Sequence, residues 1–448
     1  SADHFVVQAG HQGSLSANWQ LTNPNTLLEI EATAEVSVAA SQVLELAGAI
    51  KNEGTLTLAN AASLIQSAAF NWNSGTGVYE VTRNTGNLAD HSVFQYWAAP
   101  ISDATMAAVF SGANANDFYY YSPTASPNWQ SQSGGANMTP GRGYATTPTV
   151  NANAFNFNED RTFAGTVNNG SLSVTETAVS NDYLFLGNPY PSPISSAAFL
   201  DANPNLMGAL YFWNHATPVT GFNGTGVNNN QDYATWNYLG ATTGNNSLPP
   251  DDYIQSCQGF FVRAANALSA VQFTNAMRSN ASNVQFFKNS SKELLWLSLR
   301  KDTSLSNQLL VGFTANATSG LDPKYDALKF SGNPNLSFFS WLNNQAMGIQ
   351  GLGPLGNSTV TVPLGAYVNA AGAFSITLDS TQNFNPSHQV VLEDRDLSVF
   401  TNLKSSNAYN FTVAAADSIK QRFFLHFTKQ AVSLNGNRVL EDYQVFQQ

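Results

Sequence analysis

Four sequence blocks occur twice, in the same order, between residues 93 and 281. Each set starts with an apolar strand ending in Pro-Ile-Ser, continues with an aromatic strand and reaches a turn in which Gly precedes an aromatic residue. The first set reads VFQYWAAPIS, DFYYYSPTASPNWQ, MTPGRGYATTP and FNFNEDRTFAG; the second reads LFLGNPYPSPIS, ALYFWNHATP, YIQSCQGFFVRAA and VQFTNAMRSNA. This self-similarity indicates a duplicated β module and a scaffold, because a catalytic loop is needed only once.

The stretch LFLGNPYPSPIS (184–195) indicates how the module turns. Proline fixes φ and has no N–H, so the run Leu184–Leu186 fits a strand while the three prolines after it fit an extended bend or a sheet edge. We interpret the stretch as a structural corner. The duplicated module is predicted at 91–289, with copies at about 91–175 and 181–289.

Residues 1–90 form a separate, strand-rich N-terminal segment in this interpretation. Apolar and polar residues alternate in Leu28–Glu31, Val36–Val38 and Thr55–Leu58, with small residues and turns between them. Such short strands fit the rungs of a β-helix or a small sandwich. The Ala-rich pieces leave a helical alternative open.

From about residue 290 the sequence contains seven strand candidates separated by Gly, Asn and Pro turns. They are ELLWLSLRK, QLLVGFTANAT, STVTVPLGAY, AFSITLDS, QVVLEDRD, AYNFTVAAA and QRFFLHFTK. This spacing predicts an antiparallel β-sandwich of jelly-roll or Greek-key type at 290–430. Residues 431–448 fit a linker that enters another strand, and this strand then stops. The fold class predicted for the whole chain is therefore all-β and multidomain.

Charge and composition exclude several classes of function. Charged residues make up 10% of the chain, the formal net charge is −11, and Asn (51) outnumbers Lys, Arg, Asp and Glu together (18 and 29). Without a basic cluster, nucleic acid and anionic membrane surfaces are not expected partners, and no apolar run is long enough for membrane insertion. Cys257 is the single cysteine, so no internal disulfide forms. We expect Cys257 to be buried and to pack like a small apolar side chain. The Asn-rich composition is typical of extracellular β proteins.

No catalytic constellation emerges from the sequence. Gly351–Gly356 fits G-x-G-x-x-G, but a strand pattern follows it where a dinucleotide site needs a helix, so we interpret it as a turn. Acidic pairs occur at Asp322 with Asp326 and at Glu393 with Asp396. Calcium is the cofactor that loop carboxylates of this kind suit best. A simpler interpretation is that both acidic pairs are solvated at the surface or cap turns. Apart from calcium, no cofactor is expected.

Aromatic side chains in predicted loops are the remaining candidate binding residues. The first copy contributes Trp129, and a polar insertion found only in the second copy (220–252) contributes Tyr233, Trp236 and Tyr238. Flat rings beside Asn and Asp suit stacking on sugars, whereas core packing is the simpler alternative. As a sugar-binding site we favour the insertion over the loop that contains Trp129, because the first copy lacks the insertion.

Several of these motifs resemble a family of secreted surface proteins of the Bacteroidota that are exported by the type IX secretion system. The resemblance is carried by LGNPYPSPI, YWAAPIS, MTPGRGYA, IQSCQGFFVRA and, in the last domain, GLDPKYDALKF. It covers about residues 90–448 and is specific for architecture and export. It implies that the sandwich precedes a C-terminal sorting domain, of which LEDYQVFQQ resembles the first residues. No catalytic residue is carried over, because the matching motifs contain none.

These observations predict a secreted, non-catalytic structural or adhesive protein of the cell surface. The expected partners are further copies of the chain, assembled into a filament or surface layer, or other surface proteins. Edge strands or an N-terminal segment such as DHFVVQAG (3–10) would add to a neighbour's sheet. The alternative is a surface protein that binds glycans through the loop aromatics.

Overall fold

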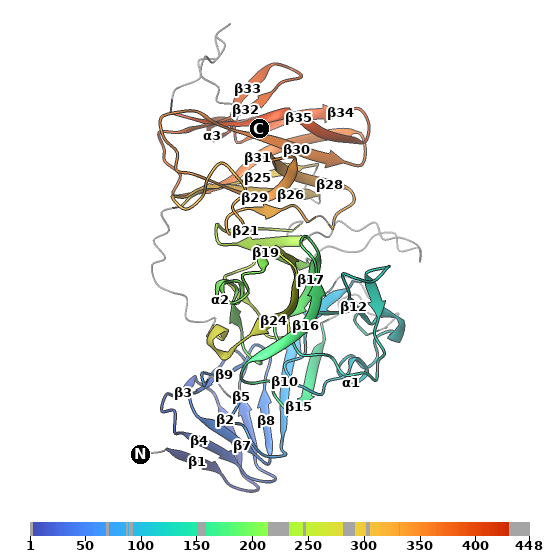
Figure 1. Cartoon of the computed structure of the whole chain (residues 1–448), viewed down its shortest axis with the longest axis vertical. Helices are drawn as coiled ribbons and strands as arrows, with labels where there is room; N and C mark the ends of the chain where they lie inside the picture. The colour runs from blue at the N-terminus through green and yellow to red at the C-terminus, as the bar shows by residue number, and fades with distance from the viewer. Residues whose placement is uncertain are drawn as a thin grey trace. The chain divides into compact units, whose positions relative to one another are not determined.

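The computed structural model describes residues 3–68, 71–86, 88, 93–149, 158–213, 233–244, 248–280, 292–301, 305–330 and 332–429 (Figure 1). As predicted, the regular structure in these residues is nearly all β. The helices in the described residues are short: α1 (Met106–Val109), α2 (Ser196–Asp201), α3 (Leu403–Ser406) and the 3-10 turns η1 (Ala115–Asp117) and η2 (Asn275–Met277). The chain forms two compact units, unit 1 (Ser1–Val227 and Pro250–Phe287) and unit 2 (Asn228–Pro249 and Lys288–Gln448).

Unit 1 begins with a three-sided β-solenoid in which short strands stack in parallel, in-register ladders (blue in Figure 1). One side contains β1 (His4–Val7), β4 (Leu27–Ile30) and β7 (Ala49–Asn52). The second contains β2 (Gln12–Leu15), β5 (Glu35–Val38), β8 (Thr55–Leu58) and β10 (Val78–Asn84). The third contains β3 (Trp19–Leu21), β6 (Val43–Leu46) and β9 (Ser63–Gln66). The β-helix prediction is confirmed, and the sandwich and helical alternatives for this segment are wrong.

Period-2 alternation forms the solenoid because every second side chain points into its interior. Leu28, Ile30 and Val38 are at most 1% exposed, while the intervening residues face outward. At the corners, Ser41 and Ala61 adopt positive φ values of 63° and 61°, which lets the chain turn between sides without a helix. The small residues that left the helical alternative open thus lie partly at corners.

The duplicated module continues unit 1, and both copies have the same strand order. The first copy contains β11 (Gln95–Trp97), β12 (Tyr119–Tyr121), β13 (Trp129–Ser131) and β14 (Tyr144–Thr146), and the second contains β17 (Tyr183–Gly187), β19 (Leu206–Trp213) and β23 (Gly259–Ala264). In each copy the strand after the Gly turn lies between two others and runs antiparallel to both. Strand β14 lies between β11 and β12, and β23 lies between β17 and β19. The remaining pairs are β15 (Asp160–Gly165) with β10, β16 (Leu172–Ala178) with β24 (Leu268–Phe273), and β18 (Ile194–Ser195) with β22 (Tyr253–Ile254).

The two copies contact each other reciprocally through their Gly turns. The Gly143 N–H donates to the Phe185 carbonyl (3.0 Å), and a Cβ on Gly143 would lie 2.6 Å from the Phe185 ring. In the equivalent contact, a Cβ on Gly259 would lie 3.0 Å from Tyr96. The Gly143 turn therefore requires glycine, because the Phe185 ring of the opposite copy occupies the space of a side chain. At Gly259 the contact with Tyr96 is tighter than ordinary packing.

The NPYPSPIS stretch is a buried corner at which β17 ends. The Asn188 amide donates to the Ser192 and Ile254 carbonyls at 2.8 and 3.0 Å, and the Tyr190 hydroxyl donates to the Gly170 carbonyl at 2.6 Å. The Pro191 carbonyl accepts a hydrogen bond from the Leu64 N–H of the solenoid (2.9 Å). The predicted structural corner is confirmed, and it also attaches the duplicated module to the solenoid.

Unit 2 is built on one large sheet that folds over a single core. Its strands are β25 (Glu293–Arg300), β26 (Ser306–Phe313), β27 (Ala327–Leu328), β28 (Leu336–Leu342), β29 (Gln345–Leu352), β30 (Val360–Val368), β31 (Gly372–Gln382), β32 (Gln389–Asp394), β33 (Val399–Asn402), β34 (Ala408–Val413) and β35 (Asp417–Thr428). The order is β33-β32-β35-β30-β28-β29-β26-β25-β31-β34, with β27 on β29. The predicted sandwich is present, but β26 and β29 are parallel rather than antiparallel.

The two compact units differ from the predicted domains at two places. The segments 1–90 and 91–289 lie in one unit, because the solenoid and the duplicated module share a hydrophobic core. Residues 228–249, from the insertion, belong to unit 2, and their described part contains the hairpin of β20 (Tyr233–Asn237) and β21 (Ala241–Thr242). The predicted linker 431–448 lies outside the described residues.

Candidate functional site

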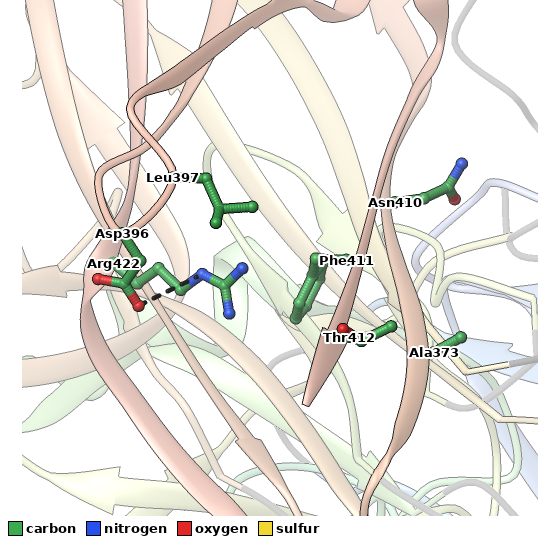
Figure 2. Close-up of a pocket in the computed structure, with 7 residues that line it drawn as sticks. All are labelled: Ala373, Asp396, Leu397, Asn410, Phe411, Thr412 and Arg422. Carbon is green, nitrogen blue, oxygen red and sulfur yellow. Dashed lines mark ion pairs between the residues drawn. The ribbon is translucent and has the colours of Figure 1, made fainter. Parts of the chain in front are cut away.

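A groove with a volume of about 560 Å³ lies in the sandwich of unit 2 (Figure 2). Its lining comes from β31, β34, β35 and the turn between β32 and β33: Ala373, Asp396, Leu397, Asn410, Phe411, Thr412 and Arg422. Strands β34 and β33 are the two ends of the strand order. The groove therefore lies where the two edges of the folded sheet approach each other.

Arg422 forms one wall of the groove and is held by the buried Asp394. Its Nε and Nη2 donate to the Asp394 carboxylate at 3.0 and 2.7 Å, and the Tyr409 hydroxyl donates to the same carboxylate at 2.8 Å. The Arg422 guanidinium lies 5.1 Å from the Phe411 ring centroid. Because the cation is fixed on one side by Asp394, it forms a rigid wall.

Burial alone would raise the pKa of Asp394, but hydrogen bonds from Arg422 and Tyr409 bring that pKa below its ordinary value. Hydrogen bonding to Asp394 raises the pKa of Arg422. Burial and the hydrogen bond to Asp394 raise the pKa of Tyr409 to about 12. The pair therefore stays ionised near neutral pH, and no group in it is set to exchange protons there.

The rim of the groove combines apolar and hydrogen-bonding groups. The Leu397 side chain is 60% exposed, and Asn410 and Thr412 are exposed on β34. Asp396 lies 3.6 Å from Arg422, the ion pair drawn in Figure 2. Since β34 pairs with β31 and is the last strand in the described sheet, its outer edge offers backbone donors and acceptors. An apolar floor beside a strand edge suits an extended polypeptide.

Asp322 and Asp326, the first acidic pair, hold a loop together. Asp322 accepts hydrogen bonds from the Thr318 N–H (2.5 Å) and hydroxyl (2.9 Å). Asp326 accepts from the Asp322 N–H at 2.6 Å and from the Gly351 N–H at 2.8 Å. Burial raises the pKa of Asp326 to about 7. The sequence thus identified two carboxylates that lie close together, and both cap backbone N–H groups.

Glu393 and Asp396, the second acidic pair, form separate interactions. Glu393 pairs with His426 (2.9 Å) and Arg395 (3.2 Å), whereas Asp396 faces Arg422 in the groove. The His426 Nδ1 lies 2.9 Å from the Thr361 hydroxyl, so this buried histidine joins neighbouring strands. Across the described part of the chain, no three His, Cys, Asp or Glu side chains gather in a way that could hold a metal ion.

The aromatic residues of the insertion are not free for stacking on a sugar. Tyr233 and Trp236 are 7% and 4% exposed, and the Tyr233 ring stacks on Phe330 at 4.3 Å. Tyr238 is half-buried, with the Lys324 ammonium 4.8 Å from its ring centroid. The prediction of exposed loop aromatics is therefore wrong at Tyr233 and Trp236, because this part of the insertion is a hairpin of unit 2.

Trp129 belongs to the aromatic cluster between the two copies of the duplicated module. Its ring centroid lies 5.4 Å from that of Phe185 and 5.9 Å from that of Phe261, both in the second copy. Tyr121 of the first copy lies 5.5 Å away. Core packing, the simpler interpretation of this residue, accounts for its position.

Two further interpretations from the sequence are confirmed. The stretch Gly351–Gly356 leads from β29 into the turn before β30, so strands lie on both of its sides. Cys257 is 2% exposed, and burial raises the pKa of its thiol.

The sequence did not reveal the groove. Its residues come from four separate stretches between 373 and 422, and no local spacing joins them. The one available signal was the arginine Arg422 directly before the apolar run Phe423–Leu425.

Comparison with protein-family models matched residues 3–427 to a family described as "Domain of unknown function (DUF8693)". The match covers most of the chain and extends across both units, so the chain belongs to this family. Searches of the curated proteins and of the solved structures found no match. Among the described residues, no helix has the length and apolar character required to cross a membrane.

Proposed function

We propose that this member of the DUF8693 family is a secreted, non-catalytic structural or adhesive protein of the cell surface that associates through open strand edges. The observation that carries the proposal is the presence of such an edge in each compact unit. In unit 1 it is the first solenoid coil, formed by β1, β2 and β3; in unit 2 it is β34 beside the groove.

Open edges support association because they present unpaired backbone groups to any neighbouring chain. Soluble proteins usually protect such edges with charges, prolines or bulges. The strands β1, β2 and β3 contain no Asp, Glu, Lys, Arg or Pro, and Phe5 and Val6 are 37% and 42% exposed. A filament or layer needs two distinct contact surfaces on each copy, and the first coil and the groove provide two candidates.

A non-catalytic role is supported by what the acidic residues do. Asp322 and Asp326 cap a loop, Asp394 fixes Arg422, and Glu393 joins His426. Each carboxylate satisfies a structural need of the fold. In this proposal the duplicated module is likewise a scaffold that supports the contact surfaces.

The extracellular location and type IX export rest on the Asn-rich, weakly charged composition and on the motif resemblance. The glycan-binding alternative has lost its principal residues, because Tyr233 and Trp236 are buried. The groove remains, and its strand edge favours a polypeptide partner over a sugar. Further copies or other surface proteins are therefore the proposed partners.

Negative-stain electron microscopy of the purified chain, at increasing concentrations and with or without calcium, tests the proposal. Fibres or lattices would support self-assembly. Single particles of one or two copies under every condition, together with no adherence to cell-surface protein preparations, would refute the structural and adhesive role. A difference between the calcium conditions would show whether a cation takes part.

A further inference from the structure

Among the described residues, the first coil of the solenoid has no further strand paired to one end of its ladders. Strand β1 pairs with β4, β2 with β5 and β3 with β6, and each is the terminal strand of its sheet. The Asp3 and Val7 carbonyls accept hydrogen bonds from the second coil. Since successive backbone groups of a strand point to opposite sides, those of His4 and Val6 face the open edge.

The opposite end of the solenoid is covered by the chain itself. Strand β15 pairs antiparallel with β10, and the Leu64 N–H of β9 donates to the Pro191 carbonyl. On the third side, the Asn52 N–H of β7 donates to the Ser74 carbonyl (2.9 Å). In the described solenoid, only the first coil therefore leaves three strand edges open.

The interior of the first coil is also exposed. The register places Phe5 above Leu28 and Trp19 above Leu44, so both aromatic side chains point into the solenoid. Leu28 and Leu44 are at most 1% exposed, whereas Phe5 is 37% exposed. The Phe5 ring meets Trp19 edge-on at 5.1 Å. The described residues thus leave an apolar cross-section uncovered at this end.

Charge distribution distinguishes this end from the rest of the solenoid. Each strand of the second coil carries an outward glutamate, Glu29, Glu35 or Glu45. Each meets a first-coil side chain at 2.9 Å: Glu29 meets His4, Glu35 meets Gln12 and Glu45 meets Gln20. The strands of the first coil add no Asp, Glu, Lys or Arg. Asp3, directly before β1, is the only acidic residue between residues 3 and 28, and it accepts a hydrogen bond from the Asn23 side chain at 3.1 Å. In a chain of net charge −11, this end face therefore offers two copies a contact with little repulsion.

We propose that the first coil of the solenoid binds the first coil of a second copy of this chain, end to end, with β1 against β1 across a two-fold axis. The inference rests on the proposed function and names one of its contact surfaces. When two identical coils face each other, their chains run in opposite senses, so all three sides meet as antiparallel pairs. Inward residues then meet inward residues, and Phe5 and Val7 of one copy cover those of the other.

A second copy suits this end better than a single peptide. One added strand pairs with one side and leaves the apolar cross-section open. A coil with the same three short sides covers every edge and the interior together. The contact is isologous and closed, so by itself it joins two copies and makes no fibre.

Sedimentation equilibrium over a wide concentration range tests the inference with three variants. Val6→Pro removes an edge N–H and Val6→Lys adds a charge; the Val6 side chain points outward, so the solenoid core is kept. Val179→Lys is the matched control, because Val179 is also exposed (61%) and lies outside the solenoid. We expect the wild-type chain and the control to dimerise, and both Val6 variants to raise the dimer Kd at least about tenfold, or about 1.4 kcal/mol.

Cross-linking tests the two-fold arrangement independently. A Val6→Cys variant places two thiols near the axis, and the buried Cys257 (2% exposed) contributes little background. A short bis-maleimide should link the Val6→Cys chains into dimers but leave a Val179→Cys variant monomeric. Circular dichroism confirms that each variant is folded.

Two outcomes would overturn the inference: a wild-type chain that stays monomeric throughout, or a dimer that the Val6 variants do not weaken. Either outcome leaves the proposed function standing if electron microscopy shows fibres, or if the chain adheres to surface proteins. Conversely, a dimer lost in the Val6 variants supports the inference even where no larger assembly forms.

Discussion

Gly143 provides the sharpest test of how the two copies of the duplicated module fit together. A Cβ on Gly143 would lie 2.6–2.7 Å from three ring carbons of Phe185, which is much closer than ordinary contact. The Phe185 ring is 2% exposed and is held between Phe261 (4.8 Å) and Tyr96 (4.6 Å). We therefore expect Gly143→Ala to force the ring or the backbone to move.

Overpacking a well-packed core costs about 1–3 kcal/mol. Alanine also lowers the conformational entropy of the unfolded chain relative to glycine, which offsets about 0.4–1 kcal/mol of that cost. Because 1 kcal/mol corresponds to roughly 2–4 °C for a unit of this size, Gly143→Ala should lower the Tm of unit 1 by several degrees. Gly135→Ala is the control: no heavy atom lies within 4 Å of its added Cβ.

Scanning calorimetry of the full chain measures both variants. A second test is the double variant Gly143→Ala with Phe185→Leu, because a smaller side chain at 185 relieves the overlap. The two changes should then be non-additive by at least about 0.5 kcal/mol. Equal Tm values for Gly143→Ala and Gly135→Ala, or strict additivity in the double variant, would refute the reasoning.

Three further predictions concern single residues. The pKa of Asp326 is about 7 in the folded state and about 3.9 when unfolded, so its contribution to stability is greatest below about pH 4 and is lost as the pH rises through 7. Asp326→Asn should flatten that part of the Tm–pH curve; an unchanged curve would contradict the assignment. Arg422→Met should lower the free energy of unfolding by about 3–5 kcal/mol, because it leaves the buried Asp394 carboxylate without its cationic partner. Urea denaturation measures the loss, and the more conservative Arg422→Lys should lose less. Trp236→Ala should cost about 3–5 kcal/mol by opening a cavity, and a stable variant that loses glycan binding would instead revive the sugar site.

Local patterns were sufficient to predict much of unit 1. Alternation in Leu28–Glu31 and Thr55–Leu58 predicts strands because side chains of a strand point alternately to its two faces. Proline cannot donate to a ladder, so the NPYPSPIS stretch had to be a corner. The duplication appears in the sequence because each copy needs the same strand, corner and Gly turn.

Other features depend on which segments meet in space. Tyr233 and Trp236 read as loop aromatics, yet they are buried because their segment forms a hairpin in unit 2. The sequence gives no sign that β26 pairs in parallel with β29, since strand propensity is the same for either direction. It also could not show that Gly143 makes room for Phe185, a residue 42 positions later in the chain.

By itself, the sequence determined that this chain folds into short strands with proline and glycine corners, repeated in two copies and carrying little charge. Those properties are local, because alternation, fixed φ and missing side chains act within a few residues. The tertiary structure alone decided which edges are covered, which aromatics are buried, and that Arg422, Leu397 and Phe411 line one groove. Such properties depend on contacts between distant segments, and local sequence patterns do not specify them.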